Sequence, residues 1–398
     1  MRFGRVPAGY VPLAILIGAA SQLGLFLAPL AAGRGQARRI VVGLLMLPAA
    51  AVVALALLDR ALLLVTGLSA PWLPAAVLGW GVLVYALAYV QLFGERLAAW
   101  ATLKRAWLAA GLTLGPVLIL AALFVGNIVF HSWSRPGYAT TAVAPLTGPV
   151  TELRVVAFNL AKAYAYRGRL RFSTAEQVRR RLDEAASAIN AERPHLVFLS
   201  EVNVESGPCP VDQVAYLARK TGMHAYAFGE NYNWGLPFYR IRSGNALLSR
   251  LPLRAVETMQ LRGAWPVLWP VGNRRVLWAD VQVNGRWLLA GSIRNDSYDL
   301  RNNARQVEQI LDYVGGRPAL LAGDFNATSK DPPIRRLRQA GQFCGAFDGP
   351  PTFHAAHPTE CLDFIFAPAA WRLVEHRVPE CRASDHRPVF SSFALPRP

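Results

Sequence analysis

The sequence predicts a protein of two parts, an all-α transmembrane domain of about four helices followed by an α/β (α+β) sandwich of two mixed β-sheets flanked by helices. The first observation behind this is an uneven distribution of charge. Residues 1–135 hold ten Lys or Arg and two acids, which leaves 32 and 23 of the totals of 42 and 25 for the remainder of the 398 residues. The second is the mixture, beyond residue 150, of a strand–helix–strand crossover with a β-hairpin, which is typical of sheet layers covered by helices. We therefore expect a transmembrane helical domain over 1–135, a linker over 136–150 and a globular domain over 151–398.

Four apolar segments without a charged residue account for most of the first part. Each is about 19 to 24 residues long, the length that a helix needs to cross a hydrocarbon core of about 30 Å. Four such segments in succession favour membrane spans over buried helices of a soluble protein. The first is the weakest, so three spans remain an alternative. The segments are Tyr10–Ala32, Ile40–Leu58, Trp72–Phe93 and Trp107–Phe130.

Loop charge predicts the orientation of these spans. With four spans, loops 33–39 and 94–106 share one membrane face and carry six Lys or Arg, whereas the other face carries four. Because cytoplasmic loops are the richer in Lys and Arg, the face with six charges is expected in the cytoplasm. The expected location is a cell (inner) membrane, with several spans and an extracytoplasmic globular domain.

The four cysteines all lie in the globular domain, at Cys209, Cys344, Cys361 and Cys381. An even number of cysteines in an oxidising compartment permits disulfides, although four reduced thiols are equally compatible with the sequence. No Cys-x-x-Cys spacing occurs, which argues against a zinc site.

The globular domain begins with a strand, a helix and a second strand, which predicts two neighbouring parallel strands. The helix is expected to begin at Ser173-Thr-Ala-Glu176, which has the spacing of a capping box. Asn284-Gly285 between two β-rich runs predicts a two-residue hairpin. The remaining expected elements are helices at 211–221, 302–314 and 333–340, and strands at 153–159, 196–201, 244–249, 276–283, 286–293, 319–322, 361–366 and 389–394.

An aromatic-rich stretch at 228–239 is expected to be an irregular loop, either on the surface or as a wall of the substrate site. The segment 137–149 has no periodicity and is expected to be an irregular linker.

Polar residues recur at the ends of the predicted strands. One acid at a strand end is usually structural, but a whole series on small and apolar strands needs a joint explanation. Carboxylate and carboxamide oxygens without thiolates favour a hard cation, Mg²⁺ or Mn²⁺. Such a site suits hydrolysis at phosphorus, where charge builds on oxygen atoms. The residues are Asn159, Glu201, Asn245, Asp324, Asn326, Asp363, Asp385 and His386.

Several segments in this order resemble the endonuclease/exonuclease/phosphatase (DNase I-like) superfamily over roughly 151–395, and the chain as a whole resembles a membrane-anchored bacterial member. The resemblance implies a four-layered sandwich and metal-dependent cleavage of a phosphoester or phosphoanhydride. Gly323-Asp-Phe-Asn326 and Ser384-Asp-His-Arg-Pro388 are its most specific segments. The others are 154–159, 199–201, 244–250 and 362–365.

The resemblance also implies roles for individual residues. Glu201 would be the principal metal ligand, helped by Asn159 and Asp385. Asp324 would orient and activate the attacking water, and Asn326 would hold a phosphate oxygen.

His386 would face the phosphate as an acid, a base or an oxyanion stabiliser, with Asp363 fixing its tautomer. A carboxylate partner raises the pKa of an imidazole and orients the ring, which makes this pair physically sensible. Whether Asp324 or His386 takes the proton is left open by the sequence.

The chain departs from the superfamily pattern in the strand that follows the hairpin. Many superfamily members end it with Thr-His-Leu, whose His contacts the phosphate or the leaving group, but this chain reads Ser292-Ile-Arg-Asn295. Arg294 or Asn295 is expected to take that place, because Arg can hold a phosphate through two hydrogen bonds. Asn245 is the third expected substrate-binding residue.

We expect a membrane-anchored, metal-dependent phosphohydrolase with a lipid-linked or small phosphate substrate, because four spans exceed what a tether requires. The architecture resembles bacterial glycopeptide-resistance membrane proteins of the superfamily. A net charge of +17 also fits a membrane-tethered nuclease acting on DNA or RNA, which is the alternative. A second alternative is a non-catalytic binding module. The substrate and the oligomeric state do not follow from the sequence.

Overall fold

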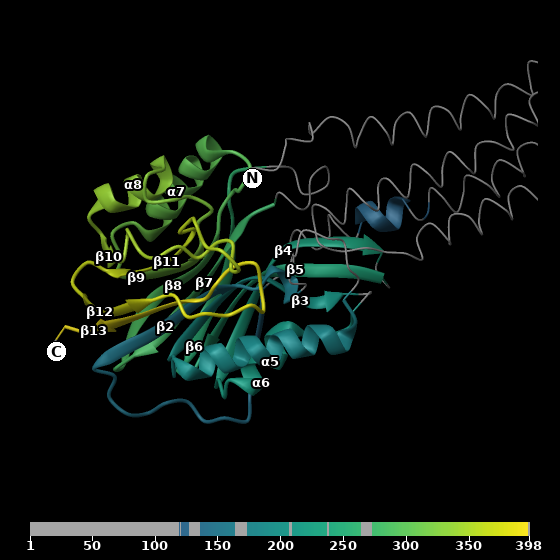
Figure 1. Ribbon diagram of the computed structural model, residues 1–398, viewed down its shortest axis with the longest axis horizontal. Helices are drawn as coiled ribbons and strands as arrows, with labels where there is room; N and C mark the ends of the chain where they lie inside the picture. Colours follow the sequence, from purple (N-terminus) through teal and green to yellow (C-terminus); the bar gives the residue numbers. More distant parts are fainter. Residues whose placement is uncertain are drawn as a thin grey trace, which may run out of the picture. The chain divides into compact units, whose positions relative to one another are not determined.

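The computed structural model describes residues 119, 121–126, 136–163, 173–206, 209–236, 239–263 and 273–396 (Figure 1). Most of the predicted membrane-spanning residues lie outside these ranges, so the number and orientation of the spans stay predictions. Within the described ranges, no helix combines the length and apolar character that crossing a membrane requires.

Two mixed β-sheets form the centre of the globular part. The larger contains, in spatial order, β1 (Gly137–Thr140), β4 (Ala225–Leu236), β5 (Tyr239–Ser249), β3 (Leu196–Ser206), β2 (Glu152–Asn159), β13 (Val389–Ala394) and β12 (Arg372–Arg377). The smaller contains β10 (Phe343–Gly345), β11 (Asp363–Pro368), β9 (Ala319–Asp324), β8 (Arg286–Arg294), β7 (Arg275–Val283) and β6 (Leu253–Gln260). Strands β2 and β3 are parallel, as predicted, and so are β8 and β9.

Helices cover the outer face of each sheet, which confirms the predicted sandwich (Figure 1). Helices α5 (Ala175–Ala191) and α6 (Gln213–Lys220) pack on the larger sheet. Helices α7 (Leu300–Val314) and α8 (Pro332–Ala340) pack on the smaller one. A third apolar core lies between the sheets. Four layers therefore enclose three cores.

Strand β2 shows how the sequence builds these layers. Val155 and Ala157 belong to the core between the sheets, whereas Val156 and Phe158 belong to the core under α5 and α6. Successive side chains of a strand point to opposite faces, so an uninterrupted apolar run fits a strand that is buried on both sides. The strand then ends in Asn159 at the rim of the sheet.

The predicted hairpin is confirmed by β7 and β8, whose two-residue turn is Asn284-Gly285. Both residues have positive φ, 48° and 78°, as a type I′ turn requires. The Asn284 side chain also bonds the backbone of Val150 through both its oxygen and its nitrogen, at 2.8 and 2.7 Å. The turn thus fixes the chain just before β2.

Three local predictions were wrong. The aromatic-rich stretch is not a loop through residue 236, because β4 pairs with β5 along its whole length. Residues 137–140 of the expected linker form β1, which pairs with β4. In both cases backbone pairing with a neighbouring strand outweighs weak local propensity. Helix α5 is capped by Thr174 with Gln177, one residue later than the spacing around Ser173 indicated.

Gly323 is required where β9 meets β8. Its φ is +140°, and a Cβ there would lie 2.1 Å from the carbonyl oxygen of Ile293.

We expect Gly323→Ala to lower the free energy of unfolding by about 2 kcal/mol or more, because the backbone of β8 would have to move. Urea unfolding followed by tryptophan fluorescence measures this. Gly148→Ala is the control, since its Cβ would meet nothing within 4 Å. Equal stability of the two variants would contradict the conclusion that a side chain at position 323 cannot be accommodated beside β8.

Candidate active site

The predicted site residues come together where the ends of β2, β8 and β9 meet. Asn159 ends β2, Arg294 ends β8 and Asp324 ends β9. The strand register places Arg294 beside Asp324, and Asp324 beside Asp363 at the start of β11. Since parallel strands β8 and β9 end at the same edge, polar residues distant in the sequence become neighbours.

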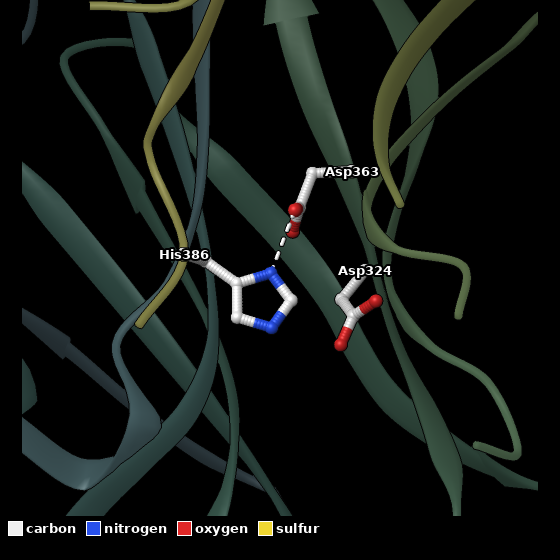
Figure 2. Close-up of side chains that lie close together, drawn as sticks. All are labelled: Asp324, Asp363 and His386. Carbon is white, nitrogen blue, oxygen red and sulfur yellow. Dashed lines mark hydrogen bonds and ion pairs between the residues drawn. The ribbon is translucent and has the colours of Figure 1, made fainter. Parts of the chain in front are cut away.

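Asp324, Asp363 and His386 form the centre of the site, and a potential ligand atom of each lies within 4.8 Å of the others (Figure 2). All three residues are buried. The Nδ1 atom of His386 lies 2.8 Å from Oδ2 of Asp363, as the sequence predicted for this pair. Thr352 donates its hydroxyl to the same carboxylate oxygen at 2.6 Å. The other oxygen of Asp363 is buried and has no protein donor within the described residues.

Asp324 is held by three hydrogen bonds from two asparagines. The backbone N–H of Asn326 donates to Oδ1 at 2.9 Å, and the side-chain amide of Asn326 donates to Oδ2 at 3.0 Å. The amide of Asn159 donates to the same Oδ2 at 2.9 Å. Asn326 also donates to the carbonyl oxygen of Asn295 at 3.0 Å. The amide of Asn326 therefore orients Asp324 in this structure. The expected role of Asn326 in holding a phosphate oxygen stays a prediction.

The electrostatic environment gives Asp324 and His386 very different pKa values. Burial raises the pKa of Asp324 to about 6, with His386 opposing the shift and Asp363 adding to it. Burial alone would lower the pKa of His386, but Asp363, Asp324 and Asp385 raise it to about 10. Near neutral pH, Asp324 is thus mostly a carboxylate and His386 an imidazolium. The Asn159 amide nitrogen lies 3.4 Å from Nε2 of His386, but its two N–H groups have closer acceptors in Asp324 and Glu201.

Glu201 occupies an irregular position in β3. Its φ is +52°, and the pairing of β3 with β5 shifts register between Leu199 and Val202. A bulge of this kind re-aims a side chain at the rim of a sheet. The carboxylate receives hydrogen bonds from the Asn159 amide at 3.3 Å, from Arg294 at 2.5 Å and from the Lys162 ammonium. Although burial would raise the pKa of Glu201, Arg294 and Lys162 hold it well below its ordinary range.

Lys162 and Arg274 are two site residues that sequence reasoning missed. Lys162 is 6% exposed and lies in a short helical turn, η1 (Ala161–Ala163), just after Asn159. Its position three residues after a predicted metal ligand was the available signal. Arg274 is buried, donates to the carbonyl oxygen of Asn295 at 3.1 Å and adds positive potential near Glu201. Burial lowers its own pKa to about 10.

The predicted substrate-binding residues have different surroundings. Arg294 is nearly buried, and its Nε is a buried donor without a partner within the described residues. Asn295 donates to Asn303 at 2.9 Å, while its side-chain oxygen is buried and has no donor in the part of the chain that the structure describes. Asn245 donates to the carbonyl oxygens of Arg275 and Ser292. Its amide is therefore used within the fold.

The predicted metal ligands fit a hard divalent cation by the chemistry of their donors, since Glu201, Asn159 and Asp385 offer carboxylate and amide oxygens. Both Glu201 oxygens are in contact with side-chain cations, and the Asn159 oxygen accepts a hydrogen bond from the backbone of Ala161 at 3.0 Å. Asp385 is partly exposed and accepts from the Ser384 hydroxyl at 3.2 Å. A cation at Glu201 would therefore have to take the place of groups already there.

The four cysteines are free thiols. Burial raises the pKa of Cys361 to about 12 and that of Cys381 to about 11, so neither thiol ionises readily. Of the two possibilities left open by the sequence, the structure has the reduced one.

The sequence profile described as "Endonuclease/Exonuclease/phosphatase family" matches residues 156–386. No curated protein matches the chain. Among solved structures, an endonuclease/exonuclease/phosphatase from Beutenbergia cavernae is 22% identical, with a TM-score of 0.49, over 62% of this chain and 72% of that one. A mannosyl-6-phosphatase from Bacteroides thetaiotaomicron is 15% identical, with a TM-score of 0.47, over 61% and 100%. The human Nocturnin catalytic domain with bound sulfate is 17% identical, with a TM-score of 0.47, over 66% and 98%.

The contact between His386 and Asp363 gives a testable pH dependence. Because folding raises the pKa of His386 to about 10, the stability it contributes is complete below its ordinary pKa of 6.5 and is lost as pH rises through 10. We expect Asp363→Asn to remove most of this loss, which is on the order of a few kcal/mol. Urea unfolding at a series of pH values from 6 to 10.5 measures the slope.

Asp348→Asn, at an exposed carboxylate, is the matched control and should keep the wild-type slope. An unchanged slope in Asp363→Asn would show that this carboxylate does not set the protonation of His386.

Proposed function

The chain belongs to the endonuclease/exonuclease/phosphatase family, and from this premise we propose that it is a metal-dependent phosphohydrolase that cleaves a phosphoester or phosphoanhydride with an activated water. The observation that carries the proposal is the buried cluster of Asp324, Asp363 and His386, in which a potential ligand atom of each residue lies within 4.8 Å of the others. Asp324, with a pKa of about 6, is a proton acceptor near neutral pH, and His386, with a pKa of about 10, is a proton donor.

The proposed reaction uses this difference directly. Asp324 accepts a proton from the attacking water as the new P–O bond forms. The bond from phosphorus to the leaving oxygen breaks, and that oxygen leaves with the electron pair. His386 donates a hydrogen bond to the phosphoryl group or a proton to the leaving oxygen, and Asp363 stabilises the imidazolium. We therefore propose Asp324 as the general base, a role for which the sequence left both Asp324 and His386 open.

Arg294 is proposed to bind the phosphate where many family members have a histidine. Its Nε is buried without a partner in the described part of the chain, while its Nη2 contacts Glu201. Glu201 raises the pKa of this guanidinium against the effect of burial, so Arg294 stays charged. It can bind an anion but cannot replace the proton-donating function of an imidazole. That function falls to His386.

A divalent cation, Mg²⁺ or Mn²⁺, is proposed to be held by Glu201, Asn159 and Asp385. When bound, such an ion neutralises charge that develops on phosphate oxygens. The low pKa of Glu201 keeps this carboxylate ionised, which is the form that binds a metal.

We further propose that the enzyme is anchored in a cell membrane and acts outside the cytoplasm on a lipid-linked or small phosphate. The support is the set of four apolar, charge-free segments in residues 1–135. Attachment beside a bilayer raises the effective concentration of a lipid substrate.

The expected activity is release of inorganic phosphate from an isoprenoid pyrophosphate or a phosphorylated lipid in the presence of Mg²⁺. Asp324→Asn should lower the rate by a factor of about 10²–10⁴, because the proton acceptor is lost while the side chain keeps its size. Malachite green detection of phosphate measures the rate, and a chelator should abolish the wild-type signal. Asp348→Asn, a change at an exposed acid, serves as the control.

Incubation with plasmid DNA in parallel distinguishes a nuclease from the proposed lipid phosphohydrolase. Nicking without release of phosphate from any lipid substrate would replace the proposed substrate with a nucleic acid. Full hydrolytic activity of Asp324→Asn would remove the proposed mechanism, and absence of both reactions in the wild type would favour a binding module.

The proposed topology has its own test. Alkaline phosphatase, which is active only outside the cytoplasm, and a fluorescent protein that folds only inside it can each be fused after residue 398. We expect activity of the first fusion and no fluorescence from the second, because the loops with six positive charges should remain cytoplasmic. The reverse result would overturn the proposed location.

A further inference from the structure

We propose that Lys162 is the resident counter-ion of Glu201 in the metal-free protein, and that a divalent cation binds Glu201 by displacing the Lys162 ammonium group. The inference rests on the proposed function only in taking Glu201 as a metal ligand. It makes Lys162 a positioning residue, one that acts on the site through Glu201.

Both carboxylate oxygens of Glu201 are already paired with side-chain cations. The Lys162 ammonium group pairs with Oε2, and Arg294 pairs with Oε1 at 2.5 Å. The exposed fractions of the three side chains are only 8% for Lys162, 12% for Arg294 and 15% for Glu201. A carboxylate this deep needs cationic partners, because the protein interior replaces little of its lost hydration.

The charges around Glu201 leave little room for an additional cation. Lys162 and Arg294 together bring two positive charges to Glu201, as many as one divalent cation would bring. If both remained in contact when the cation bound, four positive charges would gather around Glu201, and Arg274 already adds a further charge nearby. Repulsion between like charges at short distance is strong in a buried site. At least one of the two side chains must therefore leave Glu201.

Lys162 is the side chain better suited to leave. Arg294 ends β8 beside Asp324, and its planar guanidinium is also attracted by that carboxylate. The Lys162 ammonium is a compact charge on a flexible stem. Lysine is also rare here: the chain has four, at positions 104, 162, 220 and 330, among 42 Lys and Arg residues. Of the described cations that act on Glu201, Lys162 is the one lysine, beside Arg294 and Arg274.

The backbone that carries Lys162 is fixed, so only its side chain needs to move. Ala161, Lys162 and Ala163 all have positive φ, at 41°, 60° and 57°. Consecutive non-glycine residues hold this conformation only where their surroundings impose it. Here Gln213 donates to the carbonyl oxygen of Lys162 at 2.6 Å, and Arg181 donates to that of Ala163 at 2.8 Å. The strained turn holds the ammonium group at Glu201.

Binding of Mn²⁺ to the full-length protein tests the inference without any measurement of activity. We expect Lys162→Met to bind Mn²⁺ at least tenfold more tightly than the wild type, because the apparent affinity of a site falls with the fraction of molecules in which it is free. Electron paramagnetic resonance of unbound Mn²⁺ measures the dissociation constant. Lys330→Met, at an exposed lysine, should match the wild type. Lys162→Arg, which retains the charge, should bind no more tightly than the wild type.

A second measurement uses the wild-type protein and does not depend on the folding of a variant. Limited acetylation with mass spectrometry reports the reactivity of each lysine. We expect saturating Mg²⁺ to increase acetylation of Lys162 several-fold and to leave Lys220 and Lys330 unchanged. Equal or weaker Mn²⁺ binding by Lys162→Met, or protection of Lys162 by Mg²⁺, would overturn the proposal.

These results are separate from the hydrolysis assays. Phosphate release by a protein whose Mn²⁺ affinity does not respond to Lys162 would refute only the counter-ion role. A clear response of Mn²⁺ affinity in a protein that hydrolyses no phosphate would refute only the proposed function.

Discussion

Neutralisation of buried carboxylates is the constraint on which the arrangement of this site depends. Asp324 and Asp363 lie side by side in the register of β9 and β11, and Glu201 is largely withdrawn from water nearby. A carboxylate without partners would be costly in such surroundings. The chain satisfies this constraint in two ways. His386 offsets part of the charge of the aspartate pair, and Lys162 with Arg294 more than neutralises Glu201.

Asn159 connects the two charged groups, because its amide donates to both Asp324 and Glu201. The two groups are adapted to different tasks. In the aspartate–histidine group, burial raises the pKa of Asp324, and the neighbouring carboxylates raise the pKa of His386 against the effect of burial, which suits transfer and donation of protons. In the Glu201 group, the excess of positive charge lowers the pKa of the carboxylate, which suits binding of phosphate and of a metal. One short strand-end residue thus joins the proton chemistry to the charge that would hold the substrate.

Much of the fold and of the site was predictable because the signals are local. The Asn284-Gly285 turn dictates its hairpin, and apolar runs that stop at Asn159 or Asp324 mark strand ends. The pairing of Asp363 with His386 was expected from the resemblance. Elements decided by distant partners were not predicted. Strand β4 replaced an expected loop because β5 and β1 supply its hydrogen bonds, and η1 holds Lys162 in a backbone conformation that no local propensity favours.

The sequence by itself determined which groups are available: small and apolar strands with acids, amides and one histidine at their ends, and four apolar segments before them. Only the tertiary structure decided how these groups are charged. Burial and the short distances between Asp324, Asp363 and His386 set their protonation, and the bulge at Glu201 brings it to Lys162 and Arg294. Electrostatic energy depends on distance and on exclusion of water, and neither quantity exists along an unfolded chain.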